Sequence, residues 1–163
     1  MSIVKWFVIV VVLLVVVAIA AGQLGLLRGT PPTDLRVRDG KLKPPSMTEN
    51  SVTSQAALYP DHPQRKYADI APLRVKGDGP ATLARIKAIV EGMDGAKVVK
   101  SEPDYLYAQF TTRLMKYVDD VEFWYDPAAK VIQVRSASRV GRGDMGVNRK
   151  RIGAVRAALE AMK

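Results

Sequence analysis

The sequence has no cysteine among its 163 residues. This excludes disulfide bonds, thiolate nucleophiles and metal sites built on cysteine. Histidine occurs once, as His62, between two prolines in a loop-like segment where a solvated side chain is the ordinary expectation. The patterns HExxH, GxSxG and GxGxxG and the phosphate-binding loop are also missing, so the familiar hydrolase, dehydrogenase and nucleotide sites have no support. We expect no cofactor and no metal.

One long apolar run is present near the N-terminus. Residues 6–27 hold no charge and a single polar side chain, Gln23. As a helix this run spans roughly 30 Å, the hydrocarbon thickness of a bilayer. We predict a transmembrane anchor over residues 1–28. The alternative is a cleaved signal peptide, with Lys5 as its basic start and a small-residue cleavage site at residues 18–20, but the apolar run continues past that site.

Two considerations give opposite orientations for this anchor in the membrane. Lys5 precedes the run, whereas Arg28 and four more basic residues between positions 36 and 43 follow it, so short-range charge counting favours a cytoplasmic domain. Long domains, however, are translocated largely regardless of charge. We therefore predict a single-pass protein of the inner membrane whose C-terminal domain lies in the periplasm.

The charge of the chain is strongly basic. Lys and Arg number 25 against 16 Asp and Glu, which gives a net charge of +9. In a membrane-tethered protein such an excess favours anionic lipids or other polyanions as partners. Nucleic acid is the usual alternative, but the tether and the lack of aromatic residues among the basic ones argue against it. We expect the membrane, an anionic lipid or an envelope protein as partner, and no nucleic acid.

The remaining chain predicts one α+β domain. Residues 29–66 are rich in Pro, Ser and Thr and predict an extended arm, in which a short alternating run at residues 35–37, before an Asp39-Gly40 turn, is a candidate edge strand. Over residues 67–163, a helix begins at Asp78, and four alternating segments follow at 96–101, 105–112, 116–126 and 131–138. A second helix covers residues 147–162. This order predicts a four-stranded antiparallel meander flanked by two helices packed on one face.

The last two predicted strands pair by matching their apolar positions. Tyr125 then lies opposite Ile132 across the turn at residues 127–130. The same register sets Glu122 opposite Arg135, as an ion pair on the face away from the core. Asp120 shares that face. Alternation places its neighbour, position 119, on the other face near position 138.

The turn between the last strand and the last helix gathers polar groups. Three glycines interrupt residues 141–146, and the helix that follows is capped by Asp144 or Asn148, so its free N–H groups point back at the turn. Hydroxyl and guanidinium groups around a helix start suit an oxyanion. We predict an anion site formed by Arg135, Ser136, Ser138, Arg139, Asn148 and Arg149. Its supporting charge network is Asp119, Asp120, Glu122 and Asp144.

Three functions are compatible with this cluster. We favour a domain that binds an anionic ligand, a lipid headgroup or a protein partner near the membrane, without turnover. An alternative is a small envelope hydrolase or transferase that uses Glu122 or Asp120 as base, which requires a deep pocket and a carboxylate of raised pKa. The other alternative is an envelope scaffold in which the charges only lock the last helix to the sheet; it predicts an apolar patch on the free sheet face.

Four stretches carry a resemblance to a known family. YLYAQF, YVDDVEFWYD, VIQVRSASRVG and DMGVNRKRIGAVRAAL together resemble the family catalogued as domain of unknown function 1499 (DUF1499), over residues 35–160. The resemblance implies no established activity. Members often carry two cysteines ahead of the first domain helix, where this chain has Pro45 and Ser51. The resemblance implies that this pair is a dispensable staple, worth about 2 to 4 kcal/mol, and gives no support to a redox function here.

Overall fold

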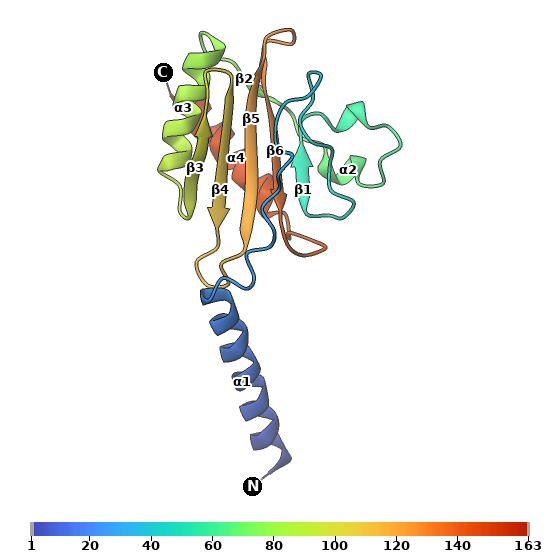
Figure 1. Cartoon of the computed structure of the whole chain (residues 1–163), viewed down its shortest axis with the longest axis vertical. Coiled ribbons are helices and arrows are strands. Elements are labelled where there is room, and N and C mark those ends of the chain that lie inside the picture. Colours follow the sequence, from blue (N-terminus) through green and yellow to red (C-terminus); the bar gives the residue numbers. More distant parts are fainter. Residues whose placement is uncertain (1, 163) are drawn as a thin grey trace.

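A long N-terminal helix stands apart from a folded α+β domain in the computed structural model, which describes residues 2–162 (Figure 1). The outermost residues of the predicted anchor and of the predicted domain, Met1 and Lys163, lie outside this range. Helix α1 covers Ile3–Gln23, and it is long and apolar enough to cross a membrane. Its large apolar side chains are exposed. Such a surface is unfavourable in water and suits a lipid environment.

The C-terminal end of α1 is fixed by its contact with the domain. The helix ends at Gln23, four residues before the end of the predicted apolar run, and Gly25 then adopts a φ of +81°. Gln23 Nε2 donates a hydrogen bond of 2.8 Å to the carbonyl of Leu114. A Cβ on Gly22 would lie 2.6 Å from the carbonyl oxygen of Met115, so only glycine fits there. The helix therefore stops where it meets a loop of the domain.

The domain is built on an antiparallel sheet of six strands in the order β1-β6-β5-β4-β3, with β2 also paired to β6. The four strands of the predicted meander are confirmed, because alternating β-branched and aromatic residues separated by turn residues are reliable strand signals. They are β3 (Ala96–Ser101), β4 (Tyr105–Thr111), β5 (Val118–Asp126) and β6 (Val131–Ser138).

The predicted number of strands was wrong. Two short strands, β1 (Ser51–Thr53) and β2 (Leu73–Arg74), both pair with the outer edge of β6. Strands of two or three residues have no periodicity to detect, and it is the free edge of β6 that orders them. The candidate edge strand at residues 35–37 does not form, and this part of the arm has only an isolated bridge between Arg38 and Lys41.

The predicted register of the last hairpin is confirmed. Tyr125 pairs with Ile132, and Glu122 pairs with Arg135. Alternation along each strand then determines the two faces of the sheet.

Two helices line one of these faces. Helix α3 (Gly79–Glu91) begins at Asp78, whose carboxylate accepts the N–H of Ala81 at 2.7 Å, and it ends at Gly92. Helix α4 covers Val147–Ala161. The buried apolar side chains of both helices belong to the same cluster as the inward apolar side chains of β4, β5 and β6, and this cluster includes Leu83, Ile86, Phe123, Val134, Ile152 and Val155.

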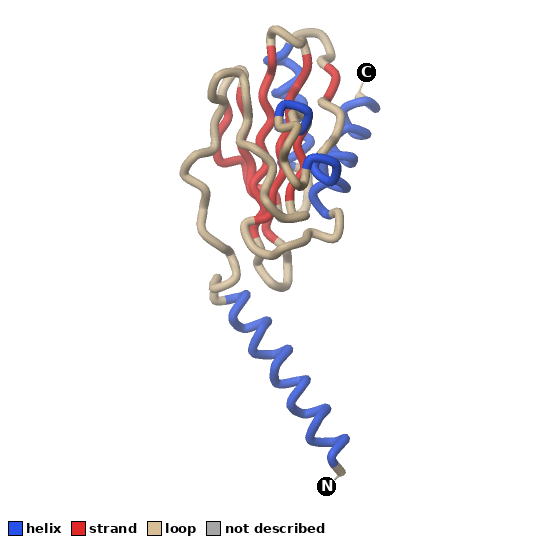
Figure 2. Tube along the Cα trace, turned by 90° about the vertical axis from the view of Figure 1, so that its right-hand side faces the viewer, coloured by secondary structure: helices blue, strands red, loops and turns tan. Residues whose placement is uncertain are grey.

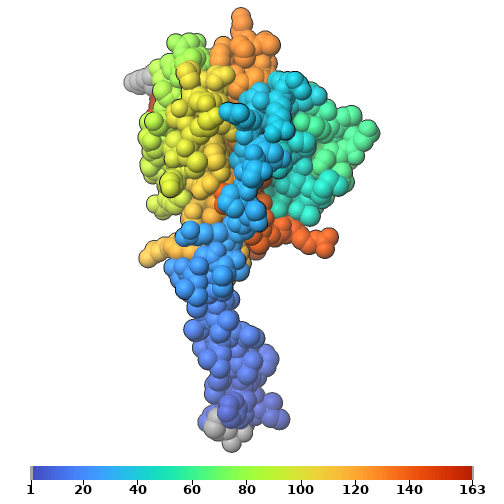
Figure 3. Space-filling model, viewed as in Figure 1, coloured from blue at the N-terminus to red at the C-terminus, as the bar shows by residue number. Residues whose placement is uncertain are grey.

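The other face of the sheet is covered by the arm. Figure 2 shows the arm and α4 on opposite sides of the sheet, and Figure 3 shows the arm running up the front of the domain. Leu42 is buried against Tyr105 and Trp124. The segment predicted to be extended also contains β1, a short 3-10 turn (Ala56–Leu58) and α2 (Arg65–Ala68). The arm therefore turns a potentially open sheet face into a second, buried layer.

Candidate functional site

The polar residues predicted to form one site are divided between the two faces of the sheet. On β6, Arg135 points toward the arm, whereas Ser136 points toward α4, because neighbouring side chains of a strand alternate. On β5, Asp120 and Glu122 likewise lie under the arm. We call the group under the arm the arm-side cluster; it consists of Asp120, Glu122, Arg135 and Arg139. We call the group under α4 the helix-side network; it consists of Asp119, Ser136, Ser138, Asn148 and Arg151.

The helix-side network is centred on Asn148, which is fully buried. Its side-chain oxygen accepts hydrogen bonds from Ser136 Oγ and, at 2.7 Å, from Arg151 Nη1. Its side-chain nitrogen donates to Ser138 Oγ at 3.0 Å. Arg151 Nη2 forms an ion pair of 2.6 Å with Asp119 Oδ2. Each of these buried groups has a partner within the protein, which is the arrangement of a structural network.

The start of α4 is occupied by the protein's own carboxylate. Asp144 accepts the backbone N–H of Gly146 at 2.9 Å and that of Asn148 at 3.0 Å, and it also accepts the hydroxyl of Tyr67. Burial alone would raise the pKa of Asp144, but these hydrogen bonds bring the pKa below its usual value. Burial and the adjacent carboxylate raise the pKa of Tyr67 to about 12. Neither predicted cap is the N-cap residue, which is Gly146, but the Asp144 carboxylate accepts the free N–H groups and fills the position that an external anion would take.

Arg149 does not join either group. Its guanidinium donates to the carbonyls of Tyr67 and Asp69, on the outer side of α4. Arg151, which was not among the predicted site residues, takes the inward position instead. Helical periodicity is the signal that identifies it, because position 151 lies three residues after the buried Asn148 on the same face.

On the other face, Arg139 and Asp120 form a two-point ion pair. Arg139 Nε lies 2.8 Å from Asp120 Oδ2, and Arg139 Nη2 lies 2.7 Å from Oδ1. Tyr107 donates its hydroxyl to the same carboxylate at 2.5 Å. The hydrogen bond to Asp120 raises the pKa of Arg139 above its usual value. Bidentate pairs of this kind are the strongest that arginine forms with a carboxylate.

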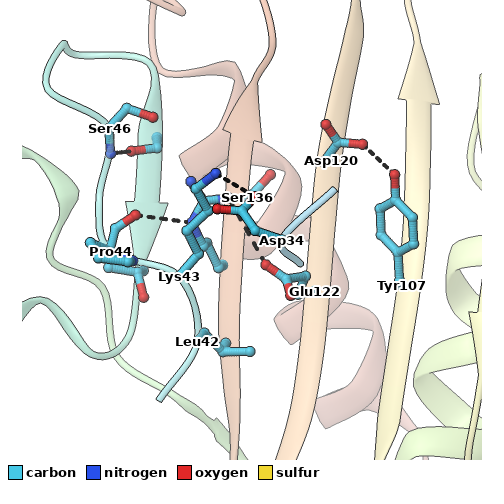
Figure 4. Close-up of polar contacts among 12 residues, drawn as sticks. Asp34, Leu42, Lys43, Pro44, Ser46, Tyr107, Asp120, Glu122 and Ser136 are labelled. Atoms are coloured by element: carbon cyan, nitrogen blue, oxygen red, sulfur yellow. Dashed lines mark hydrogen bonds and ion pairs between the residues drawn. The ribbon is translucent and has the colours of Figure 1, made fainter. Parts of the chain in front are cut away.

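Glu122 and Arg135 are much less well matched. Glu122 is 0% exposed, and Tyr105 donates to its Oε1 at 2.7 Å, but its Oε2 has no hydrogen-bond partner among residues 2–162. Arg135 Nη1 lies 4.0 Å from this oxygen. The only hydrogen bond that the Arg135 side chain makes within the described chain runs from Nε to the carbonyl of Pro44, at 3.2 Å. Figure 4 shows the carbonyl of Pro44, the carboxylate of Glu122 and the hydrogen bond between Tyr107 and Asp120.

Burial governs the ionisation of this pair. It raises the pKa of Glu122 above its usual value, although the Tyr105 hydroxyl and the charge of Arg135 act in the opposite direction. Burial also lowers the pKa of Arg135, against the opposing charge of Glu122. An arginine nevertheless keeps its proton in a protein. Of the two groups, Glu122 is therefore the one that can take part in a protonation change, and its protonation would leave Arg135 as an unneutralised buried cation.

A cavity of about 600 Å³ lies between the arm and this part of the sheet. Its sheet side is formed by Asp120, Arg135, Ala137, Ser138 and Arg139, and its arm side by residues 30–34 and 43–46. Lys43 and Asp34 form an ion pair of 2.7 Å on the arm side. The cavity begins only seven residues after the last residue of α1. Sequence reasoning missed the contributions of the arm, because a proline-rich segment without periodicity gives no signal of what it covers.

The position of one family-specific pair is also visible in the arm. The backbone N–H of Ser46, which follows Pro45, donates to Ser51 Oγ at 2.7 Å. The two segments in which the resemblance places cysteines are therefore neighbours, held here by a hydrogen bond. No group of three carboxylate or imidazole side chains in residues 2–162 is arranged to hold a metal ion.

Comparison with known proteins gives one match. A family model described as a protein of unknown function (DUF1499) matches residues 41–159. This range contains the whole sheet, helix α3, helix α4 as far as Leu159, and the part of the arm from Leu42 to Ser46. No curated protein and no solved structure matches the chain.

Proposed function

The chain belongs to the DUF1499 family, whose description states no activity, and from the geometry of the arm-side cavity we propose that it is a membrane-anchored binding protein for the anionic group of a lipid. The phosphate or carboxylate of the lipid would lie in the cavity against Arg135. Binding takes place without chemical turnover. Helix α1 anchors the protein in the inner membrane, and the domain lies on the periplasmic side.

The observation that carries this proposal is the state of Arg135. Its side chain lines a cavity, it is only 4% exposed, and its two terminal nitrogens make no hydrogen bond to residues 2–162. A buried guanidinium normally has its donors satisfied, because each unpaired charged donor costs free energy. A bound phosphate or carboxylate would supply the missing acceptors in the two-point geometry that arginine favours.

The charge balance of the cavity supports an anion as ligand. Arg139 is already neutralised by Asp120, and Lys43 lies 2.7 Å from the carboxylate of Asp34. Arg135 is the remaining cation of the lining, and its nearest carboxylate stays 4.0 Å away. No hydrogen bond between residues of the described chain joins Arg135 to that carboxylate. An anion would therefore enter without having to displace a closely bonded ion pair.

The position of the cavity supports a lipid as the source of that anion. Its arm side begins at Thr30, shortly after the end of α1. Four prolines of the arm, at positions 31, 32, 44 and 45, line it beside the polar groups, which suits a ligand with an apolar part. A headgroup can reach such a site from the adjoining bilayer surface.

An envelope hydrolase or transferase is the second candidate, and the raised pKa of Glu122 favours it. Glu122 does not line the cavity, however, and it is fully buried. Asp120 does line the cavity, but its carboxylate is held by Arg139 and Tyr107. Neither carboxylate is thus placed to act as a free base, and binding without turnover is the better account. A pure scaffold would not need the cavity or the unsatisfied arginine.

The experiment compares the lipids bound to three full-length proteins. The parent, Arg135→Gln and Arg149→Gln are extracted in the same detergent, supplemented with phosphatidylglycerol or with phosphatidylcholine, and examined by native mass spectrometry. We expect the parent and Arg149→Gln to retain phosphatidylglycerol, and Arg135→Gln to lose it by at least about tenfold, as expected for one charge-assisted contact. Phosphatidylcholine should bind weakly to all three.

Arg149→Gln is the matched control because it removes an arginine that lies outside the cavity. Equal loss in both variants would show that positive charge in general, and not the cavity, attracts lipid. Equal retention in all three would contradict the proposal. A thermal unfolding scan of each variant separates lost binding from lost folding.

A further inference from the structure

Three segments far apart in the sequence meet at the end of the domain from which α1 leaves (Figures 1 and 3). They are residues 24–28 after α1, residues 112–117 between β4 and β5, and residues 139–146 between β6 and α4. The end of α1 contacts the second segment, since Gln23 donates to the Leu114 carbonyl at 2.8 Å. We name these three segments the rim.

The rim exposes large apolar side chains. Leu24 and Leu26 are 78% and 73% exposed, Leu114 is 55% exposed, and Met145 is 94% exposed. Met145 also has a φ of +50°, a conformation that side chains other than glycine adopt at a cost in free energy. The turn therefore holds this methionine outward despite backbone strain. Apolar side chains gathered at one end of a domain indicate a surface that contacts an apolar partner.

The charges of the rim are predominantly positive. Arg28, Arg113, Lys116 and Arg142 are exposed or half-buried. Arg139 is neutralised by its ion pair with the sheet, and the one carboxylate of the rim, Asp144, is buried and hydrogen-bonded. Two further carboxylates lie beside the rim: Asp94, in a neighbouring turn, and the exposed Glu49, whose backbone pairs with Gly143. Basic residues interleaved with exposed leucine and methionine are typical of a surface that lies in the headgroup region of an anionic membrane.

We propose that the rim is a membrane-contact surface, on which the domain sits directly against an anionic bilayer. Leu114 and Met145 insert at the level of the headgroups, and Arg113 and Arg142 contact lipid phosphates. This inference rests on the anchoring role of α1 in the proposed function, because the end of α1 places the rim at the bilayer surface. It also adds something new, since a helix followed by a free linker would leave the domain away from the lipid.

The absence of cysteine makes a direct test possible, because every introduced cysteine carries the only label. Leu114→Cys, Met145→Cys and Ala129→Cys are each spin-labelled in the full-length chain and reconstituted in nanodiscs of equal parts phosphatidylglycerol and phosphatidylcholine. Ala129 is the control, since it is exposed in the turn at the other end of the β5–β6 hairpin. The accessibility of each label to a water-soluble nickel chelate and to oxygen is measured by electron paramagnetic resonance.

We expect the labels at positions 114 and 145 to be several-fold less accessible to the nickel chelate than the label at position 129, and more accessible to oxygen. Equal accessibility at all three positions would overturn the proposal that the rim contacts the membrane, but not the proposals for the anchor and the cavity. Failure of the full chain to enter the nanodiscs would overturn both the anchoring role of α1 and the membrane contact of the rim. Lipid binding at Arg135 is measured in detergent, so its outcome is independent of both.

The role of charge is tested in the Met145→Cys background. Arg113→Glu with Arg142→Glu should restore nickel accessibility at position 145, whereas Lys130→Glu, in the distant turn, should not. Replacing phosphatidylglycerol by phosphatidylcholine in the nanodisc should have the same effect as the double substitution. A label that stays protected in both cases would overturn the electrostatic part of the inference.

Discussion

The two faces of the β5–β6 hairpin present the same kinds of side chain in opposite states. On the helix side, Arg151 is bonded to Asp119, and Asn148 is satisfied at both ends of its amide. On the arm side, Arg135 stands 4.0 Å from a carboxylate that is itself missing a partner. The helix-side network is closed by the last helix of the domain, and the arm-side cluster is closed only by an irregular segment with a cavity beneath it.

This difference distinguishes charged residues that stabilise the fold from charged residues that can bind a ligand. Clustered arginines and carboxylates are equally visible in the sequence on both faces. A satisfied network stabilises the fold and has no donors left for a ligand. A buried cation with free donors beside a cavity has room for a ligand, and a ligand would satisfy those donors. The comparison makes four predictions, which follow in order of expected size.

The largest effect is expected on the helix side. Arg151→Ala should lower the free energy of unfolding by about 3 to 5 kcal/mol, because it leaves Asp119 buried without its partner. Chemical denaturation measures the loss. The neighbouring Lys150→Ala, which removes an exposed side chain, should stay within about 0.5 kcal/mol of the parent. A similar small loss in both variants would mean that the network is not structural.

The next largest effect is expected from a crosslink between positions 45 and 51 of the arm. Pro45→Cys with Ser51→Cys should form a disulfide under oxidising conditions, since the Ser46 N–H already lies 2.7 Å from Ser51 Oγ. Closing so short a loop should stabilise the domain by about 2 kcal/mol. Thermal unfolding of the oxidised and reduced forms of the same variant gives the comparison. If oxidation lowers the unfolding temperature, the two positions are not suited to a crosslink.

The third prediction is a pH dependence from Glu122. Its pKa is raised in the folded state, so the folded protein holds the proton more tightly than the unfolded chain. Stability should therefore fall as the pH rises from about 4.3, the unfolded value, through the folded-state pKa, by at most about 1.4 kcal/mol per pH unit.

Glu122→Gln should flatten this decline when unfolding is followed from pH 4 to pH 8 in steps. Asp144 affects stability in the opposite direction, because its pKa is lowered in the folded state. Its contribution to folding stability is lost only as the pH falls below about 4. A variant curve parallel to that of the parent above pH 4.3 would show that Glu122 does not titrate there.

The smallest effect is expected when the mismatched pair is replaced as a whole. Glu122→Gln with Arg135→Met should leave the free energy of unfolding within about 1 kcal/mol of the parent, or raise it, because a poorly matched buried pair offsets little of its desolvation cost. Denaturation measures stability, and native mass spectrometry should show that bound phosphatidylglycerol is lost. A large destabilisation would place this pair in the same structural class as Arg151 and Asp119.

Much of the fold was predictable because its signals are local. The two-residue period of the strands determined the pairing of Glu122 with Arg135, and Asp78 and Pro80 marked the start of α3. The candidate site was less predictable. Arg149 was selected as a ligand residue and Arg151 was not, although Arg151 follows Asn148 by three residues on the same face of α4 and takes the inward position.

The sequence by itself determined the long apolar helix, the central strands, the register of the last hairpin and the family, since each depends on residue types at fixed spacing. Only the tertiary structure decided that the arm lies over Arg135, through a contact with Pro44 that spans 91 residues of sequence. It also decided that Asp144 occupies the start of α4. Local periodicity states which side chains share a face, but what covers that face depends on the packing of distant segments, and packing has no period along the chain.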